Sequence, residues 1–179
     1  MRTVKEIWEL VEPIGSCMYE GDIQIYHKYL SLLPVNSTVL DVATGRGVSA
    51  LAMAMSNPLV NITTIDDGTT IIWNKWAEDK DAYIKKVYGL CKTMGVSNIS
   101  LVFSDFFDFD FSSIPEIDLF HVDDEDEEGK MLEFAIPHVK SGGILLVRNY
   151  NRFTETVDEL CRGYEYLESG GLIKVIRKV

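Results

Sequence analysis

The chain has 179 residues, 46% of them hydrophobic and 25% charged, which is the composition of a globular protein large enough for its own core. A net charge of −11 argues against a nucleic-acid partner, because lysine and arginine are what bind a phosphate backbone. We expect a single domain over residues 1–179, with a helical cap at 1–36 and an α/β core at 37–179.

Neither a membrane anchor nor a secretory signal is expected. No apolar run approaches the roughly 20 residues needed to span a bilayer. The charged side chains of Lys5, Glu6 and Glu9 leave residues 1–10 without the apolar centre of a signal peptide. The three cysteines are widely spaced without a Cys-x-x-Cys pair, which is typical of free thiols in a reducing compartment. We therefore predict a cytoplasmic protein with no membrane partner, whose oligomeric state the sequence leaves open.

Two helices are predicted before the first strand. Apolar residues at 4, 7, 8 and 11 have helical spacing, and Pro13 and Gly15 end that helix. A second helix is expected to begin with Asp22 as its N-cap and to present Tyr26 and Leu30 on its apolar face. The glycine-bracketed segment 15–21 between them either closes over a ligand or simply connects the helices.

The most informative stretch is residues 39–50. A short apolar strand carries one carboxylate, Asp41, and the small residues Ala43, Thr44, Gly45 and Gly47 follow it. Small residues let a ligand lie directly against the backbone. Residues 49–55 then have high helix propensity. A strand, a turn of small residues and a helix start predict the nucleoside-binding corner of a doubly wound α/β sheet.

A second strand, over residues 60–67, ends in two carboxylates. Asp66 lies 19 residues after Gly47, where a nucleotide-binding fold places the acid that binds ribose hydroxyls. The alternative is a plain turn, because Asp-Asp-Gly is favourable turn chemistry. We predict the ribose role for Asp66 first and for Asp67 second.

Strands and helices alternate through the rest of the chain. A helix is predicted at 76–94, strands at 99–104 and 117–122, a helix at 127–139, a turn at 141–143 and a strand at 144–149. Trp73 and Trp76 either line a pocket or pack in the core. Two last runs, 164–168 and 172–179, are separated by Ser-Gly-Gly and predict a hairpin. The expected fold is a three-layer Rossmann-like α/β sandwich, with a mostly parallel seven-stranded sheet and an antiparallel C-terminal hairpin.

One reading of the glycine turn is an NAD(P)-dependent oxidoreductase, because Gly45-x-Gly47-x-x-Ala50 satisfies the dinucleotide fingerprint. Three features argue against it. Asp41 puts a charge inside a strand that is usually apolar in pyrophosphate binders, the chain has no room for a separate substrate domain, and the terminal hairpin is foreign to that sheet.

These features resemble the class I S-adenosylmethionine-dependent methyltransferases over about residues 38–179. Residues 41–47 resemble the first motif of that family, with Ala43 in place of its first glycine, and residues 142–146 resemble its fifth-strand entry. The resemblance implies S-adenosyl-L-methionine as the cofactor. Its cationic and hydroxyl groups can bind to the carboxylates of the site, whereas a phosphate ligand would be repelled by them. It implies that the cofactor is held by Asp41, Ala43, Thr44, Gly45, Gly47, Asp66, Asp67, Ser104, Asp105 and Phe106.

The methyl acceptor is expected above the carboxyl ends of the fourth and fifth strands. The candidate catalytic residues there are Asp123, Asp124, Arg148 and Asn149. Asp123 is predicted to act as a base or to orient the acceptor, with Asp124 second. The alternative is that both carboxylates belong to the acidic run 123–128 and only keep a loop solvated while favouring a helix N-terminus. His121 is expected to be a satisfied core histidine.

The region is most similar to small catechol-type, antibiotic- and sugar-modifying O-methyltransferases. Their fourth strand ends in an Asp that is often a metal ligand, matched by Asp123, and their fifth in Asp-Asn, where this chain has Arg148-Asn149. The Arg148 guanidinium has no lone pair with which to bind a metal ion, so we expect no metal. The alternative is a magnesium ion bound by oxygens of Asp124, Glu125 and Asp126. Arg148 is expected to pair with Asp123 or to grip an acceptor carboxylate.

The predicted function is therefore methyl transfer from S-adenosyl-L-methionine to an O or N atom of a small molecule. A second alternative, besides the oxidoreductase, is a non-catalytic protein that binds S-adenosylmethionine.

Overall fold

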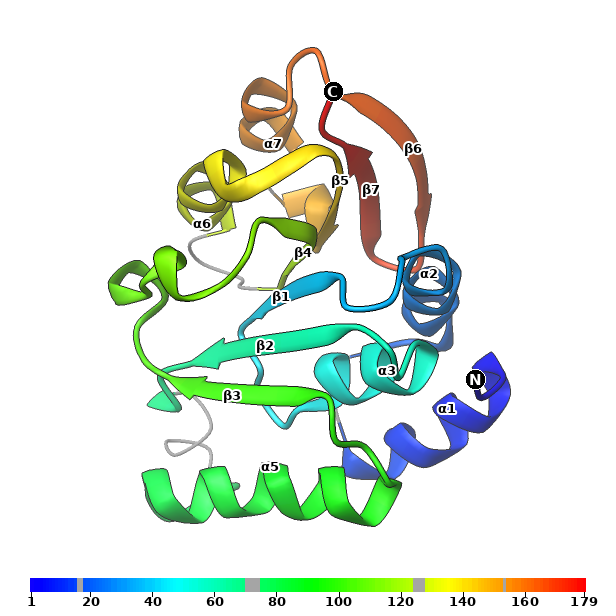
Figure 1. The fold of residues 1–179 in the computed structure, drawn as a ribbon, viewed down its shortest axis with the longest axis vertical. Helices are drawn as coiled ribbons and strands as arrows, with labels where there is room; N and C mark the ends of the chain where they lie inside the picture. The colour runs from blue at the N-terminus through cyan, green and yellow to red at the C-terminus, as the bar shows by residue number, and fades with distance from the viewer. Residues whose placement is uncertain (16–17, 70–74, 124–127, 153) are drawn as a thin grey trace.

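The computed structural model describes residues 1–15, 18–69, 75–123, 128–152 and 154–179 and contains a seven-stranded sheet (Figure 1). The strand order is β3-β2-β1-β4-β5-β7-β6, and β7 runs antiparallel to both of its neighbours. The strands are β1 Thr38–Val42, β2 Asn61–Asp66, β3 Ile99–Phe103, β4 Ile117–Val122, β5 Val139–Arg148, β6 Glu165–Gly170 and β7 Ile173–Arg177. The predicted fold class, with its C-terminal antiparallel hairpin, is confirmed.

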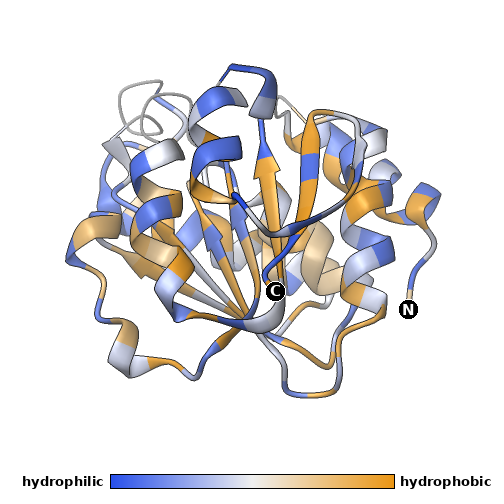
Figure 2. Ribbon diagram, turned by 90° about the horizontal axis from the view of Figure 1, so that it is seen from above, coloured by the Kyte–Doolittle hydropathy of each residue, from blue (hydrophilic) through white to orange (hydrophobic). Residues whose placement is uncertain are grey.

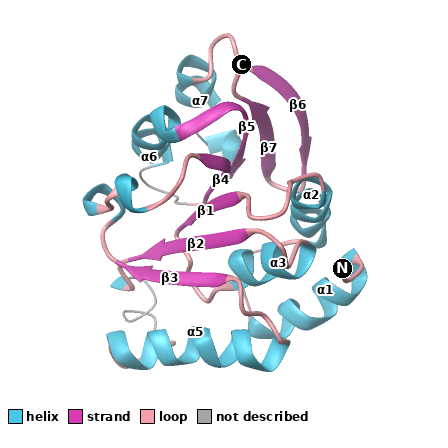
Figure 3. Ribbon diagram, viewed as in Figure 1, coloured by secondary structure: helices cyan, strands magenta, loops and turns pink. Residues whose placement is uncertain are grey.

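Helices cover both faces of the sheet (Figures 1 and 3). On one face lie α1 Val4–Val11, α2 Glu20–Ser31, α3 Val48–Ser56 and α5 Lys80–Met94. On the other lie α6 Glu128–Ala135 and α7 Thr154–Leu160, with short 3-10 turns at Phe106–Asp108, Phe111–Ser113 and Ile136–His138. No helix in the described part of the chain is long and apolar enough to cross a membrane.

The strand pleat divides the core into two clusters, one on each face of the sheet. The first contains Val39, Leu119 and Leu146, and the second contains Leu40, Phe120 and Leu145. Seen from above, the central strands are largely apolar between helices that carry both polar and apolar residues (Figure 2). By the same alternation, the polar residues Asp41, His121 and Arg148 lie on the face covered by α2 and α3.

Two helix starts differ from the predictions. Helix α2 begins at Glu20 with Tyr19 as its N-cap, and Asp22 is its third residue, where its carboxylate accepts the Tyr19 amide at 3.0 Å. Helix α5 begins at Lys80 rather than at residue 76, because Asp79 is its N-cap and Lys75 has a left-handed backbone with φ 59°. Trp76 packs partly against the core, whereas Trp73 lies outside the described residues.

The second half of the chain also departs from the predictions. Helix α6 ends at Ala135, and Pro137 lies in the 3-10 turn that follows. Strand β5 begins at Val139 rather than at residue 144, so the predicted glycine turn at 141–143 is part of this strand. The pairing of β5 with β4 shifts register there, between Ile117 and Leu119 of β4. Helix α7 was not predicted, because its seven residues are mostly polar and give no clear apolar face. Only Val157 of them is buried.

Candidate functional site

The turn between β1 and α3 has three residues with a left-handed backbone. They are Ala43 (φ 66°), Gly45 (φ 52°) and Gly47 (φ 82°). Glycine adopts this conformation freely, whereas alanine is strained there. Gly47 is the N-cap of α3, and no side chain caps this helix end. The first amides of α3 are therefore not occupied by a capping side chain and suit an anionic group such as a carboxylate.

Asp66, the last residue of β2, is bound to this turn. Its Oδ2 accepts the Gly45 amide at 2.8 Å, and its Oδ1 accepts the Gly68 amide. Burial raises the pKa of Asp66 to about 6, although these two hydrogen bonds oppose the rise. Each oxygen accepts one amide and has a second lone pair, so the carboxylate can also accept sugar hydroxyls. Asp67 is exposed and accepts two hydrogen bonds from Thr69 in a local turn. Among the described residues it has no hydrogen bond to the glycine turn.

Asp41 is completely buried beneath the turn. Its Oδ2 accepts the hydroxyls of Ser49 at 3.1 Å and Thr64 at 2.6 Å, and its Oδ1 lies 2.6 Å from His121 Nδ1. The predicted direct contact between this carboxylate and a cationic ligand therefore does not fit the geometry. Among the described residues, the Asp41 carboxylate bonds three side chains, which hold it beneath the turn.

The chain of buried polar groups continues into helix α2. Asp41 can only accept, so His121 Nδ1 carries the proton, and in the neutral ring Nε2 accepts the Tyr26 hydroxyl at 2.9 Å. His121 is fully buried, which confirms the prediction of a satisfied core histidine. Burial, and then the charge of Asp123, raise the pKa of Tyr26, so this phenol keeps its proton. Tyr26 was predicted only to lie on the apolar face of its helix, and its contact with His121 was not predicted.

Helix α1 and its following turn are tied to the glycine turn by Arg46. The guanidinium donates to the carbonyl oxygens of Ile14 at 3.1 Å and Gly15 at 2.7 Å. The start of the segment that was predicted either to close over a ligand or to connect two helices therefore lies against the glycine turn. Residues 16 and 17 of that segment lie outside the described residues.

The remaining predicted cofactor residues have different environments. Thr44 is buried, and its hydroxyl bonds that of Thr64. The Ser104 amide donates to the carbonyl of Asp66 at 3.2 Å, so the end of β3 lies beside the ribose candidate. Asp105 is exposed and caps the next turn, whereas Phe106 is 4% exposed and stacks in the aromatic core. Only the backbone of Phe106 can therefore face a ligand.

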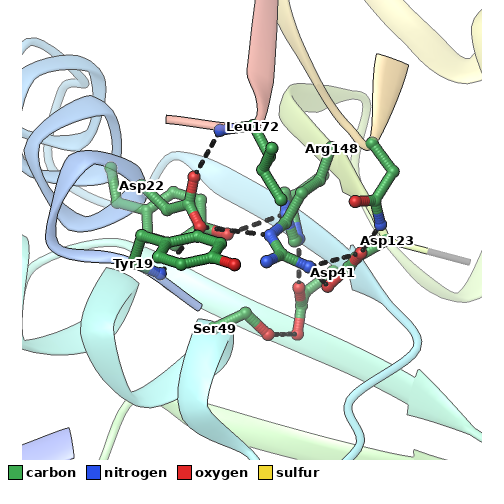
Figure 4. Close-up of polar contacts among 10 residues, drawn as sticks. Tyr19, Asp22, Asp41, Ser49, Asp123, Arg148 and Leu172 are labelled. Atoms are coloured by element: carbon green, nitrogen blue, oxygen red, sulfur yellow. Dashed lines mark hydrogen bonds and ion pairs between the residues drawn. The ribbon is translucent and has the colours of Figure 1, made fainter. Parts of the chain in front are cut away.

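Three of the four predicted catalytic residues meet at the ends of β4 and β5 (Figure 4). Arg148 Nη1 donates to Asp123 Oδ1 at 2.9 Å and Oδ2 at 2.8 Å, and Asn149 Nδ2 donates to Asp123 Oδ1 at 2.9 Å. Asp124 lies outside the described residues. Arg148 also donates from Nε to Asp22 Oδ2 at 3.2 Å. This contact was not predicted, because Asp22 was interpreted as the N-cap of a helix.

This arrangement does not fit a divalent metal ion. Both oxygens of Asp123 face a guanidinium, and Asn149 turns its amide nitrogen, a donor, toward the same carboxylate. Within the described ranges, no group of three acidic, histidine or cysteine side chains is arranged to hold a metal. The alternative magnesium site with Asp124, Glu125 and Asp126 lies outside the described residues. Burial opposes the charge of Arg148, but Asp123 and Asp22 outweigh it and raise the pKa of the guanidinium above its ordinary value. The positive charge at this edge of the sheet is therefore permanent.

Comparison with known proteins gives matches in structure alone. No family model and no curated protein sequence matches the chain. A provisionally assigned caffeoyl-CoA O-methyltransferase from Staphylococcus aureus superposes with a TM-score of 0.70 at 14% identity, over 99% of this chain and 93% of its own. An rRNA methylase from Streptococcus thermophilus gives 0.64 at 15% identity, over 92% and 100%. The chain has the fold of these methyltransferases.

A precorrin-6y C5,15-methyltransferase from Geobacter metallireducens has the same fold, with a TM-score of 0.64 at 13% identity, over 88% of this chain and 87% of its own. The three proteins are named for methylation of unlike substrates. At such identities the likeness establishes the fold, and the activity has to be argued from the site.

Proposed function

We propose that the chain is an S-adenosylmethionine-dependent methyltransferase that transfers a methyl group to an O or N atom of a small molecule. The observation that carries the proposal is the link from Asp66 to Gly45, which sets a carboxylate beside a turn of left-handed residues at the carboxyl edge of the sheet. The methyltransferase fold of the three structural neighbours supports it.

The charges at this edge favour a nucleoside over a dinucleotide. Asp66 is already hard to ionise because of its burial, and the charges of Asp67 and Asp41 add to that difficulty. A pyrophosphate would bring further negative charge to the same place. A ribose diol instead donates hydrogen bonds to the carboxylate, and the uncapped amides of α3 suit the ligand's own carboxylate. The segment at Ser104 and Asp105 is the candidate for the adenine amino group.

When bound, the cofactor supplies an electrophilic methyl group on a cationic sulfur. The acceptor's lone pair forms the new bond to the methyl carbon as the carbon–sulfur bond breaks, and the acceptor's proton leaves to solvent. Alignment of these atoms supplies most of the rate. We assign Asp123 to orienting the acceptor rather than to proton abstraction, because Arg148 holds both of its oxygens while Oδ2 keeps one lone pair.

A small-molecule acceptor suits the charge of the chain. The net charge of −11 disfavours a polynucleotide, although one neighbour of the same fold is named as an rRNA methylase. We therefore infer a neutral or cationic acceptor of low molecular weight.

Calorimetry with S-adenosylhomocysteine and with NAD tests the proposal. We expect one equivalent of S-adenosylhomocysteine to bind and NAD not to bind. Binding of NAD alone would overturn the proposal in favour of an oxidoreductase. Turnover of methyl-labelled S-adenosylmethionine on panels of phenols and amines then separates an enzyme from a protein that only binds the nucleoside.

A further inference from the structure

Arg148 is held between two carboxylates at the acceptor edge of the sheet (Figure 4). Its side chain is 3% exposed, that of Asp22 is completely buried, and that of Asp123 is 21% exposed. The Nε and Nη1 nitrogens bind different acids, so the plane of the guanidinium is fixed at two points.

Asp22 is itself fixed by the backbone around it. Its Oδ2 accepts the Tyr19 amide at 3.0 Å, and its Oδ1 accepts the Leu172 amide at 2.9 Å. The turn between β6 and β7 approaches so closely that a Cβ on Gly171 would lie 2.2 Å from Asp22 Oδ1. Asp22 therefore joins α2, the terminal hairpin and β5, which is more than a helix cap needs.

We propose that Asp22 is a positioning residue that holds Arg148 against Asp123, so that the guanidinium serves as the built-in cation of the acceptor site. The inference rests on the proposed function, which makes this edge the acceptor site. This role of Arg148 explains why the site does not fit a metal ion. The guanidinium already supplies the positive charge that a divalent cation would bring to Asp123. Such a cation cannot be chelated or exchanged, and its two hydrogen bonds keep the Asp123 carboxylate oriented.

The first test measures whether Asp22 holds Arg148. We expect the Nε–H of Arg148 to exchange slowly with solvent in nitrogen-resolved NMR spectra of the wild-type protein. In Asp22→Asn the single amide oxygen can still accept the Leu172 amide in place of Oδ1. The amide nitrogen in place of Oδ2 can accept neither the Tyr19 amide nor the Arg148 Nε–H, so exchange of that Nε–H should become at least about tenfold faster. Unprotected exchange in the wild type, or unchanged exchange in the variant, would overturn the proposal.

Asp118→Asn is the matched control. Asp118 is also a largely buried acid, at the opposite edge of the sheet, where it accepts the Thr38 amide at 2.7 Å and pairs with Lys140. Its loss should lower the melting temperature comparably and leave the Arg148 signal unchanged. A general loosening of the fold would move the Arg148 signal in both variants, which would count against a specific role for Asp22.

The second test uses Mn²⁺ as a probe for the cation position. We expect millimolar Mn²⁺ to leave the melting temperature of the wild type unchanged and to raise that of Arg148→Gln by about 3 °C or more, because two carboxylates then face one another without a cation. The double variant Asp22→Asn with Arg148→Gln should lose most of this rise. Stoichiometric Mn²⁺ binding to the wild type that Asp123→Asn abolishes would overturn the proposal, even if Arg148→Gln does not fold.

These outcomes are distinguishable from failure of the proposed function. If S-adenosylhomocysteine does not bind the wild type, the proposed function fails whatever the Arg148 signal shows. If it binds while Mn²⁺ occupies the Asp123 position of the wild type, the methyltransferase proposal stands and the built-in cation is wrong.

Discussion

Cofactor affinity should depend on pH through Asp66. Burial raises the pKa of this carboxyl to about 6, and only the ionised form accepts two ribose hydroxyls. With a pKa of about 6, the ionised fraction is about 9% at pH 5 and about 91% at pH 7. We therefore expect the affinity for S-adenosylhomocysteine to rise about tenfold, or about 1.4 kcal/mol, between these pH values. Because the ligand stabilises the ionised form, protons should be released on binding near pH 6.

Isothermal calorimetry measures both effects, since proton release appears as a dependence of the binding enthalpy on the buffer. Asp66→Asn should remove the pH dependence and weaken binding at pH 7.5 by roughly 1–3 kcal/mol through the lost charged hydrogen bonds. Asp67→Asn is the matched control, because Asp67 is the next residue, is exposed and bonds Thr69. Since the charge of Asp67 raises the pKa of Asp66, its removal should lower that pKa and should not weaken binding at pH 7.5. Affinity that is flat between pH 5 and 7, or an equal loss in both variants, would refute the ribose assignment.

The same shift has a consequence for stability. The folded-state pKa of Asp66 lies above its model value of 3.8, so the folded state binds more protons than the unfolded state between about pH 4 and 6. The contribution of Asp66 to stability therefore falls as pH rises through this window, by up to about 3 kcal/mol. Asp66→Asn should flatten this part of the unfolding free energy against pH, measured by urea titration, and an unchanged profile would contradict the assignment of the raised pKa.

Three further substitutions give distinct outcomes. Asp123→Asn should lower turnover about 100-fold while S-adenosylhomocysteine affinity stays within about twofold, because alignment of the acceptor is lost and the cofactor site is not touched; equal loss of both would indicate a structural role. Ala43→Gly should raise the unfolding free energy by about 0.5–1 kcal/mol, since it relieves a left-handed alanine at φ 66° at some cost in backbone entropy, and a lower melting temperature would contradict this. Tyr26→Phe should cost about 1–3 kcal/mol in urea unfolding by leaving His121 Nε2 buried without its donor, and a neutral effect would show that this bond adds nothing.

Much of the fold could be predicted because local chemistry encodes it. The β-branched run before Asp66, the small residues from Ala43 to Gly47 and the Ser-Gly-Gly link near the C-terminus each specify a local conformation. Predictions failed where tertiary contacts decided the outcome. Strand β5 starts five residues early because residue 139 pairs with Ile117 of β4, and nothing in the local sequence reports that pairing.

The site was predictable in part for the same reason. Asp66 ends β2 and Asp123 directly follows β4, so a parallel sheet brings both to the carboxyl ends of its strands whatever their side-chain contacts. The partners that define their environments lie far away in sequence, as Arg148 and Asp22 are 126 residues apart and Tyr26 and His121 are 95 apart. No spacing rule joins such positions. Asp41 and His121 are direct neighbours on adjacent parallel strands, so that pair could have been found once β1 was placed beside β4.

The most direct test of the central claim is a crystal structure of the complex with S-adenosylhomocysteine. We expect the ribose hydroxyls to lie within hydrogen-bond distance of the Asp66 carboxylate and the ligand's own carboxylate to lie at the first amides of α3. The sulfur should face the edge where Asp123 and Arg148 pair. A nucleoside bound elsewhere, or an Asp66 carboxylate that contacts only the Gly45 and Gly68 amides in the complex, would contradict it.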